Sequence, residues 1–313
     1  MRYSGDIICH IIAFMVVAVW GSTFVFTKML MMAGLSPTQI FTLRFALAYM
    51  LMAGWCIADG KWQTFTRSWR DEMLMVALGI TGGTLYFTTE NVALLYTTAT
   101  NAALIVCSCP LFAMLLSALI YRHKRIVTRL RATGSLMAFM GMAVVVLNGR
   151  FVLHLSPKGD LLAFSACLSW AVYSLLMKQA TQRYSPLLVT RKVFFYGLLG
   201  IMPYYLLFPH ETWIFHWGEE HTQQVFTIGV IGNLLFLGIV ASMAAFLIWS
   251  WIITKLGTIV ATNWIYFNPI TTILFANWML REQITPWFII GTILILTGMY
   301  MCNHITQKEK SAG

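Results

Sequence analysis

The sequence predicts an all-α integral membrane protein with ten transmembrane helices, arranged as two inverted five-helix repeats. The first observation behind this prediction is composition. Of the 313 residues, 59% are hydrophobic and only 10% are charged, and the mean hydropathy is +0.73. A soluble domain carries about 25% charged residues. The second observation is an internal repeat that relates the two halves of the chain.

Ten apolar runs follow one another along the chain, each long enough for a membrane-spanning helix of about 20 residues. None shows the alternating pattern of a membrane β-strand, which favours helices throughout. The first run is too long for the core of a cleavable signal peptide, so none is expected. The predicted spans are 7–32, 37–58, 72–96, 98–121, 130–149, 159–180, 187–208, 225–254, 258–280 and 285–304.

Lys and Arg are distributed unequally between the two sets of predicted loops. The bias is about three to one toward the set that shares a side with both termini, and loop 122–131 contributes most to it. By the positive-inside rule, both termini are expected in the cytoplasm. The net charge of +10 then serves orientation and contact with anionic lipid, so nucleic acid is not an expected partner.

The internal repeat relates the two halves of the chain. The segment WGSTFVFTK, which begins at Trp20, is matched by WAVYSLLMK, which begins at Trp170, and Ser36-Pro37 recurs as Ser185-Pro186. Each half holds five predicted helices, and because five is odd the halves enter the membrane in opposite orientations. Such inverted repeats are a transporter architecture. We expect the first repeat to cover residues 1–150 and the second to cover 151–313, with a short cytoplasmic tail.

Two prolines at corresponding places interrupt apolar helices. Pro110 and Pro269 lie 159 residues apart, and the surrounding segments align without a gap. Proline removes one backbone donor, so the carbonyls near Val106 and Ile265 are predicted to be free. Interrupted helices in matching positions point to a transporter's central site, and we expect these two helices to line it and to act as gating points.

With WGSTF near the start, ENVALLYTTATNAALIVCSCPLF in the first half and FNPITTILFANWMLREQIT in the second, the chain resembles EamA-type permeases of the drug/metabolite transporter superfamily. The resemblance covers nearly the whole chain. It implies a ten-helix carrier of the bacterial inner membrane, often an exporter of amino acids or other small metabolites. One departure is Arg122-His123, where the family often has Gly-Glu after helix 4; Arg281-Glu282 keeps the glutamate.

Glu90 is the main candidate for a functional residue, because it is the only carboxylate that falls well inside a predicted span. An acid at membrane depth is functional by default, and facing the interior is the expected orientation. The alternative is a neutral acid bonded to a helix backbone or lying nearer the interface. Arg44 is the next candidate. It faces a substrate carboxylate, pairs with Glu90, or extends its head group to the membrane interface.

Aromatic and amide side chains complete the predicted substrate site. Trp20 and Trp170 occupy equivalent positions and either contact substrate or pack helices. Polar side chains near the prolines either cross-link helices or meet a ligand. The predicted substrate-binding residues are Trp20, Arg44, Glu90, Asn101, Trp170, Tyr266 and Asn268.

No catalytic, metal or cofactor site is expected. The chain lacks the HExxH, GxSxG and P-loop patterns, and the histidine-rich segment 210–221 fits no standard zinc spacing. The leading prediction is a secondary transporter of a small-molecule substrate that works by alternating access. A membrane-embedded receptor or scaffold of the same fold is the alternative, and a membrane enzyme is a third reading. No feature of the sequence sets an oligomeric state.

Overall fold

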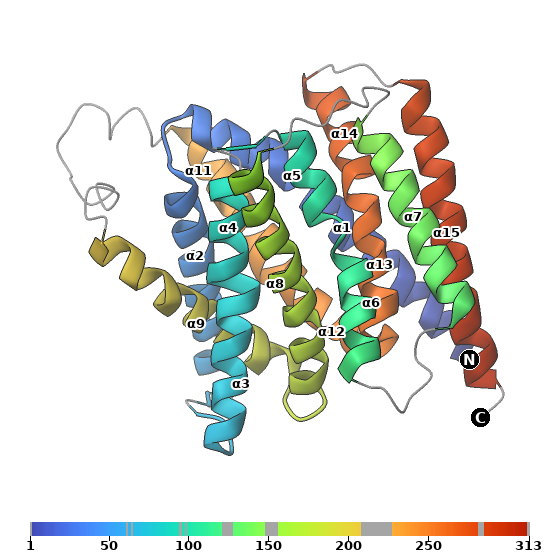
Figure 1. Ribbon diagram of the computed structural model, residues 1–313. Helices are drawn as coiled ribbons and strands as arrows, with labels where there is room; N and C mark the ends of the chain where they lie inside the picture. The colour runs from blue at the N-terminus through green and yellow to red at the C-terminus, as the bar shows by residue number, and fades with distance from the viewer. Residues whose placement is uncertain are drawn as a thin grey trace.

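The computed structural model describes residues 2–60, 62–63, 65–93, 96–97, 99–120, 128–147, 156–207, 227–280 and 285–311. Within these ranges, only the backbone course is described for residues 2–6, 24, 28, 99–101, 103, 276, 279–280 and 303–311. The described part is helical with turns and bends, and contains no strand. Figure 1 shows the helices side by side in one bundle. The predicted all-α membrane fold is confirmed.

The first half contains six α-helices before α7, because two of its predicted spans are split. The third span is a continuous run of α3, a π-helical segment η1 and α4, and the fourth is broken into α5 and α6. The elements are α1 (Arg2–Met32), α2 (Pro37–Ala58), α3 (Trp69–Gly79), η1 (Ile80–Leu85), α4 (Tyr86–Ala93), α5 (Ala99–Val106), α6 (Cys109–Ile120) and α7 (Arg129–Leu147).

The second half repeats this plan. Its third span is again widened by a π-helical segment, η3, and its fourth is again interrupted, here by a 3₁₀ turn, η4. The elements are α8 (Pro157–Thr181), α9 (Pro186–Leu207), α11 (Ile228–Leu235), η3 (Phe236–Ala244), α12 (Ala245–Leu256), α13 (Thr258–Asn263), η4 (Trp264–Phe267), α14 (Asn268–Leu280) and α15 (Pro286–Ser311).

Local sequence explains where several helices begin. Ser36 forms a capping box, in which its hydroxyl accepts from the Gln39 amide at 3.3 Å while its own amide donates to Gln39 Oε1 at 2.8 Å. Pro37 follows at the first helical position, where the missing N–H has no cost. Ser68 and Thr227 cap α3 and α11 with their hydroxyl groups alone, each of which accepts a hydrogen bond from the backbone amide three residues later.

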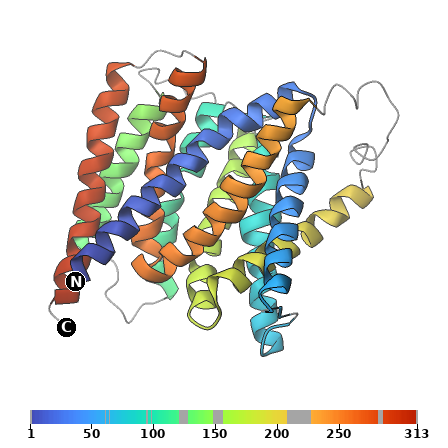
Figure 2. The ribbon, with the colours of Figure 1, turned by 180° about the vertical axis from the view of Figure 1, so that it is seen from behind.

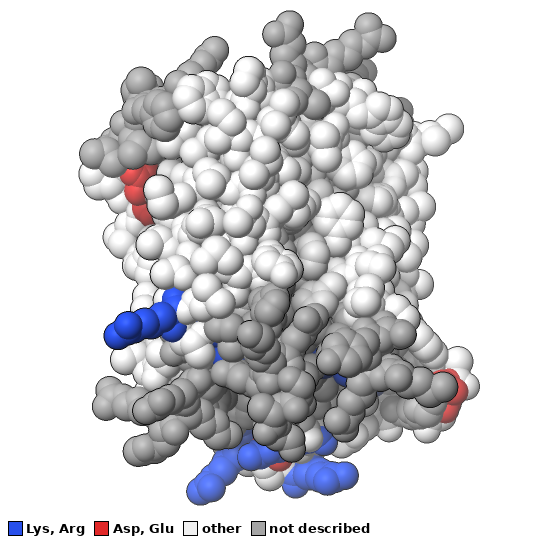
Figure 3. Space-filling model, turned by 90° about the vertical axis from the view of Figure 1, so that its right-hand side faces the viewer, with Lys and Arg blue, Asp and Glu red and all other residues white. Residues whose placement is uncertain are grey.

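The predicted spans agree with the described helices to within about three residues, except that α1 begins at Arg2 rather than at residue 7 and α15 continues to Ser311 rather than ending at residue 304. Five long helices are apolar enough to cross a membrane, and shorter apolar helices occupy Leu104–Ile120 and Pro286–Cys302. The beginning of α1, the end of α15 and the turn between α8 and α9 lie at the same end of the bundle (Figure 1). On the face that carries α7 and α15, uncharged side chains form most of the upper and central surface, and most of the described Lys and Arg seen there lie lower down (Figure 3).

Contacts between the halves are reciprocal. Helix α2 packs against η3, and its counterpart α9 packs against η1, the counterpart of η3. Helices α7 and α15 are the most extensively packed pair; there Gly134 meets Gly298 and Gly141 meets Gly291. Figure 2 shows α1 running obliquely across the back of the bundle, where it packs on α12 and α14. Reciprocity of this kind is what a two-fold relation between equal units produces.

Both prolines lie at helix interruptions. Helix α5 ends at Val106, and Pro110 is the second residue of α6. Pro269 is likewise the second residue of α14, directly after η4. The prediction of a free carbonyl at Ile265 is wrong, because this oxygen accepts a hydrogen bond from the Asn268 amide. The tighter 3₁₀ turn supplies a donor three residues on, which an α-helix would not use.

Candidate functional site

An aromatic cluster joins the two halves near the centre of the bundle. The Trp20 ring, from α1, lies 5.5 Å from the Trp170 ring of α8 and 5.0 Å from the Trp249 ring of α12, measured between centroids. Phe246 contacts both Trp20 and Trp170, at 5.6 and 6.0 Å. Trp20 Nε1 also donates to the Ala241 carbonyl at 3.0 Å. Helices from both repeats are therefore held together through one group of rings.

Arg44 lies beside this cluster as a buried cation. Only 6% of the residue is exposed, and its Nε donates to Ser242 Oγ at 2.8 Å. The guanidinium carbon stands 5.0 Å from the centroid of the Phe87 ring. Ser242 belongs to η3, and π-helical turns rotate the side chains that follow them and occur often at functional sites. The position of Arg44 in the first repeat thus depends on a wide turn in the second.

Glu90 lies in the last turn of α4, closer to a helix end than its predicted depth. It is half-buried, and its Oε1 accepts from the Tyr86 hydroxyl at 2.9 Å. The Tyr86 ring in turn packs on Trp170 at 4.9 Å. The acid therefore faces the aromatic cluster and is held by a side chain of its own helix.

Arg44 and Glu90 do not form an ion pair in the described structure. Each uses a neutral hydrogen-bond partner instead: Ser242 for the cation and Tyr86 for the acid. The sequence suggested that Arg44 could pair with Glu90 or face a substrate carboxylate. The structure does not contain the pair with Glu90. The arrangement keeps two opposite charges apart in an apolar surrounding, where a ligand with both charges would satisfy them.

Three buried donors of the same region have no hydrogen-bond partner within the described part of the chain. They are Trp170 Nε1, Tyr173 Oη and Trp249 Nε1. An unpaired buried donor costs about 1–3 kcal/mol, so native proteins keep such groups where a ligand or water pairs with them. An excess of donors suits a ligand that carries acceptor oxygens, such as a carboxylate.

The predicted residues near Pro269 have other hydrogen-bond partners than this group, although Tyr266 belongs to the same hydrophobic core as Trp170. Tyr266 is fully buried and its hydroxyl lies 3.1 Å from Ser135 Oγ of α7, which makes it part of the contact between α7 and η4. Asn268 Oδ1 is buried without a partner among the described residues. Asn101 lies in α5, and its side chain is outside the described part.

Ser242 is the site residue that the sequence reasoning missed. A lone serine in an apolar run carries little signal by itself. The usable signal was its place in the repeat. At the 159-residue offset of the two prolines, Ser242 in η3 corresponds to Gly83 in η1, the segment that precedes Glu90 in the first half. The described cysteines are all free thiols, and no group of three metal-ligating side chains occurs among the described residues. The histidine-rich segment 210–221 lies outside them.

Comparisons with known proteins agree with this architecture. The EamA-like transporter family matches residues 7–147 and 157–303, one copy for each half. An uncharacterized transporter of Archaeoglobus fulgidus is 26% identical over 93% of this chain and 97% of its own. A probable terminal-alkyne amino-acid exporter of Streptantibioticus cattleyicolor is 24% identical over 89% and 86%.

Two further matches complete the comparison. A probable amino-acid metabolite efflux pump of Salmonella typhimurium is 25% identical over 64% of this chain and 66% of its own. One solved crystal structure superposes with a TM-score of 0.74, covering 96% of this chain and 98% of the other at 19% identity. At that identity the structural match supports the fold alone.

Proposed function

The chain belongs to the EamA-like transporter family, and from this premise we propose that it is a secondary transporter that exports a small amino-acid-like metabolite by alternating access. Its membership of a transporter family makes it a membrane transporter rather than an enzyme. Two relatives carry names that refer to amino-acid export. Those names describe the relatives, and they motivate the substrate class proposed here.

The observation that carries the proposal is the separation of Arg44 from Glu90. A zwitterionic amino acid carries a carboxylate and an ammonium group a few ångströms apart. Arg44 would bind the carboxylate, since a guanidinium pairs with two oxygens at once. Glu90 would bind the ammonium, and Trp20 and Trp170 would contact the side chain of the substrate.

Alternating access would follow from the two-repeat construction. We propose that residues 1–150 and 151–313 are inverted copies and that their relative motion exposes the site to each side in turn. The reciprocal contacts of α2 with η3 and of α9 with η1 support this proposal. The interruptions at Pro110 and Pro269, where α6 and α14 begin, would be the hinges.

We further propose a bacterial inner-membrane location with both termini in the cytoplasm, on the basis of the Lys and Arg bias. Lys158 and Gln182 are exposed near opposite ends of α8, so each can carry a single cysteine in a cysteine-free variant. A membrane-impermeant maleimide added outside intact cells is expected to label Lys158→Cys and to spare Gln182→Cys. The reverse pattern would overturn the orientation.

Transport itself is tested in sealed proteoliposomes loaded with one unlabelled amino acid at a time. Entry of the same labelled amino acid by exchange is expected for some members of the panel, at rates well above protein-free vesicles. The matched control is the Arg44→Gln/Glu90→Gln double variant. Binding of an amino acid without exchange would favour the alternative of a receptor. No exchange and no binding across the panel would overturn the proposed substrate class.

A further inference from the structure

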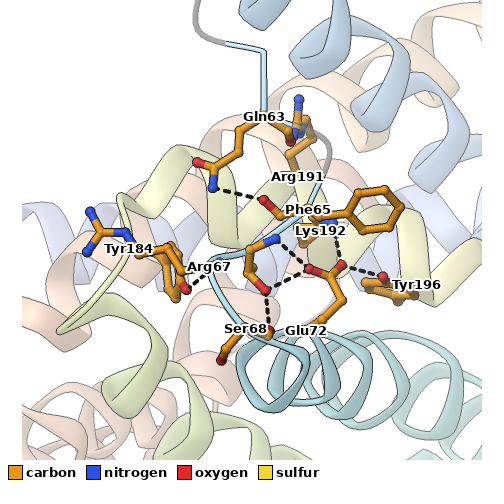
Figure 4. Close-up of polar contacts among 10 residues, drawn as sticks. Gln63, Phe65, Arg67, Ser68, Glu72, Tyr184, Arg191, Lys192 and Tyr196 are labelled. Carbon is orange, nitrogen blue, oxygen red and sulfur yellow. Dashed lines mark hydrogen bonds and ion pairs between the residues drawn. The ribbon is translucent and has the colours of Figure 1, made fainter.

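A second group of buried charges lies between the beginning of α3 and the first turns of α9. It is covered by the described residues 62–63 and 65–68, which we call the strap. Figure 4 shows Glu72 of α3 at its centre. The Glu72 carboxylate accepts from the Thr66 amide and the Thr66 hydroxyl, both at 2.8 Å, and from Lys192 and Tyr196. Glu72 is therefore fully bonded, and Lys192 is its counter-ion.

Arg191, the neighbour of Lys192, lacks such a counter-ion. Only 3% of Arg191 is exposed, yet no carboxylate among the described residues forms an ion pair with it. Its Nη2 donates to the Gln63 carbonyl of the strap, and its guanidinium lies 4.1 Å from the Trp62 ring centroid. Its Nη1 has no hydrogen-bond partner in the described part of the protein. A buried cation with a free donor is unfavourable unless something else binds it.

The strap residues that cover the two cations are themselves exposed. Trp62, which lies on Arg191, is 43% exposed, and Phe65, whose ring centroid lies 5.5 Å from Lys192 Nζ, is 70% exposed. The strap joins α2 to α3 in the first half, whereas Arg191 belongs to the second half. Because its hold on the guanidinium is one carbonyl and one ring face, both neutral, an anion can compete for the same cation.

The repeat gives this cation a counterpart. The Ser-Pro pairs that precede α2 and α9 are 149 residues apart. Arg44 is the seventh residue after Pro37, and Arg191 is the fifth after Pro186. The two arginines thus occupy similar depths in equivalent helices, and Arg44 lies toward the opposite end of the bundle from the strap. One cation serves the proposed central site, while the other is covered.

We infer that Arg191 is a second oxyanion-binding site, which takes a carboxylate or phosphate group when the strap lifts. A guanidinium offers two parallel N–H donors to such a group, and the free Nη1 is the donor that the strap leaves unused. Two sources supply the same chemistry: the carboxylate of a small transported molecule, or the phosphate of an anionic lipid. Only the first source rests on the proposed transport function; the site itself does not.

The experiment reads out the strap directly. Gln63→Cys is introduced into a cysteine-free variant, labelled with an environment-sensitive fluorophore, and placed in phosphatidylcholine nanodiscs. Acetate or inorganic phosphate is titrated at constant ionic strength against chloride. A second arm replaces the lipid by phosphatidylglycerol without added anion. A saturable fluorescence change with acetate or phosphate supports the site with a small anion as ligand, and a change confined to phosphatidylglycerol supports it with lipid as ligand.

The assignment to Arg191 comes from matched variants. Arg191→Gln is expected to raise the half-saturating anion concentration at least tenfold. Arg183→Gln is the control and should leave this concentration unchanged, because Arg183 is an exposed arginine paired with Asp71 at 2.7 Å. Trp62→Ala removes one competitor for the guanidinium and should lower the half-saturating anion concentration about threefold, the size of one cation–π contact. This variant decides the matter if Arg191→Gln does not fold.

Three results would overturn the inference: no response in either arm, a full response in Arg191→Gln, or an unchanged midpoint in Trp62→Ala. Failure of the proposed transport is distinguishable from these results. A protein that shows no amino-acid exchange in proteoliposomes but keeps the Arg191-dependent strap response would lack the transport function and retain the oxyanion site.

Discussion

Trp20 and Trp170 meet edge to face, with ring centroids 5.5 Å apart and an interplanar angle of 87°. They occupy equivalent positions in the two repeats, 150 residues apart. Phe45 and Phe194, 149 residues apart, also meet, at 4.7 Å. Equivalent residues of two related units can touch only close to the axis that relates the units. The aromatic cluster therefore lies on the line about which the halves are expected to move.

The two tryptophans differ in their hydrogen bonds, which gives a paired test. Trp20 Nε1 is bonded to Ala241, whereas Trp170 Nε1 has no partner among the described residues. If substrate pairs with the free donor, Trp170→Phe should weaken substrate affinity about fivefold, the equivalent of one hydrogen bond of ~1 kcal/mol. Trp20→Phe is the control, because its donor is already engaged.

The measurement is the concentration dependence of exchange for a transported amino acid in proteoliposomes. The expected result is a larger KM for Trp170→Phe than for Trp20→Phe, with similar amounts of folded protein. Equal KM values for the two variants would show that Trp170 Nε1 does not reach the substrate.

The separated charges predict that each end of the substrate depends on a different residue. Glu90→Gln removes the charge but keeps an oxygen that can accept from Tyr86. It should lower the affinity for a free amino acid about tenfold or more, since hydrogen bonds to charged groups contribute about 1.5–3 kcal/mol. It should leave the affinity for the N-acetyl derivative unchanged, because that molecule has no ammonium group.

Arg44→Gln is the reciprocal variant. It should weaken binding of the free amino acid and of its N-acetyl derivative, while the amino-acid amide, which lacks the carboxylate, is unaffected. Affinities are measured by competition with a labelled amino acid. Equal losses for all three compounds in both variants would mean that these residues support the fold rather than select the substrate.

The close contact of α7 with α15 predicts a sharp difference between two glycines. A Cβ added at Gly141 would lie 2.7 Å from the Gly291 carbonyl oxygen and 2.7 Å from the Ile295 amide nitrogen. These are backbone atoms, so the helices must move apart, and overpacking of this kind costs about 1–3 kcal/mol. Gly141→Ala should therefore lower the thermal stability of the purified protein.

Gly54 of α2 is the control, because a Cβ added there meets nothing within 4 Å. Gly54→Ala is expected to leave stability unchanged or to raise it, by up to about 1 kcal/mol from helix propensity. Equal melting temperatures for the two variants would contradict the tight α7–α15 contact.

The helix positions, the repeat and the family could be read from sequence because they rest on long apolar runs and on motifs that recur. The capping serine at Ser36 and the prolines at helix starts are local signals of the same kind. The thickness of the membrane sets the length of a hydrophobic span, so the spans can be predicted without knowing how the helices pack.

The site was harder to predict because it depends on which side chains of different helices meet. Arg44 and Glu90 were recognisable as charges at membrane depth, but their partners were not. Ser242 faces Arg44 because of the wide turn of η3, and a π-helical turn has no clear sequence signature. Tyr266 looked like a ligand residue beside Pro269, yet it is fully buried against Ser135. The Glu72–Lys192 pair was hidden for a similar reason, since its members belong to helices of different halves of the chain.

Asp71, at the beginning of α3, is expected to make the stability of the fold depend on pH in the acid range. The Tyr184 hydroxyl donates to its carboxylate at 2.9 Å, Ser68 donates at 2.9 Å and Arg183 at 2.7 Å. These bonds, led by that from Tyr184, hold the pKa of Asp71 below its ordinary value of 3.8. A carboxyl whose pKa is lowered by folding stabilises the fold above its unfolded pKa, and the stabilisation disappears as pH falls through the folded pKa.

The stabilisation from Asp71 should therefore be complete at pH 5–7 and decline below about pH 4. Asp71→Asn cannot ionise, so its melting temperature should be lower than that of the wild type at neutral pH, and the difference should shrink as the pH falls below 4. Arg183→Gln keeps the bonds from Tyr184 and Ser68 to Asp71. Its melting temperature at neutral pH should therefore lie between those of the wild type and Asp71→Asn. Melting temperatures of detergent-solubilised protein between pH 3 and 7 provide the measurement. A gap between wild type and Asp71→Asn that stays constant down to pH 3 would mean that the Tyr184 and Arg183 contacts do not favour the ionised form.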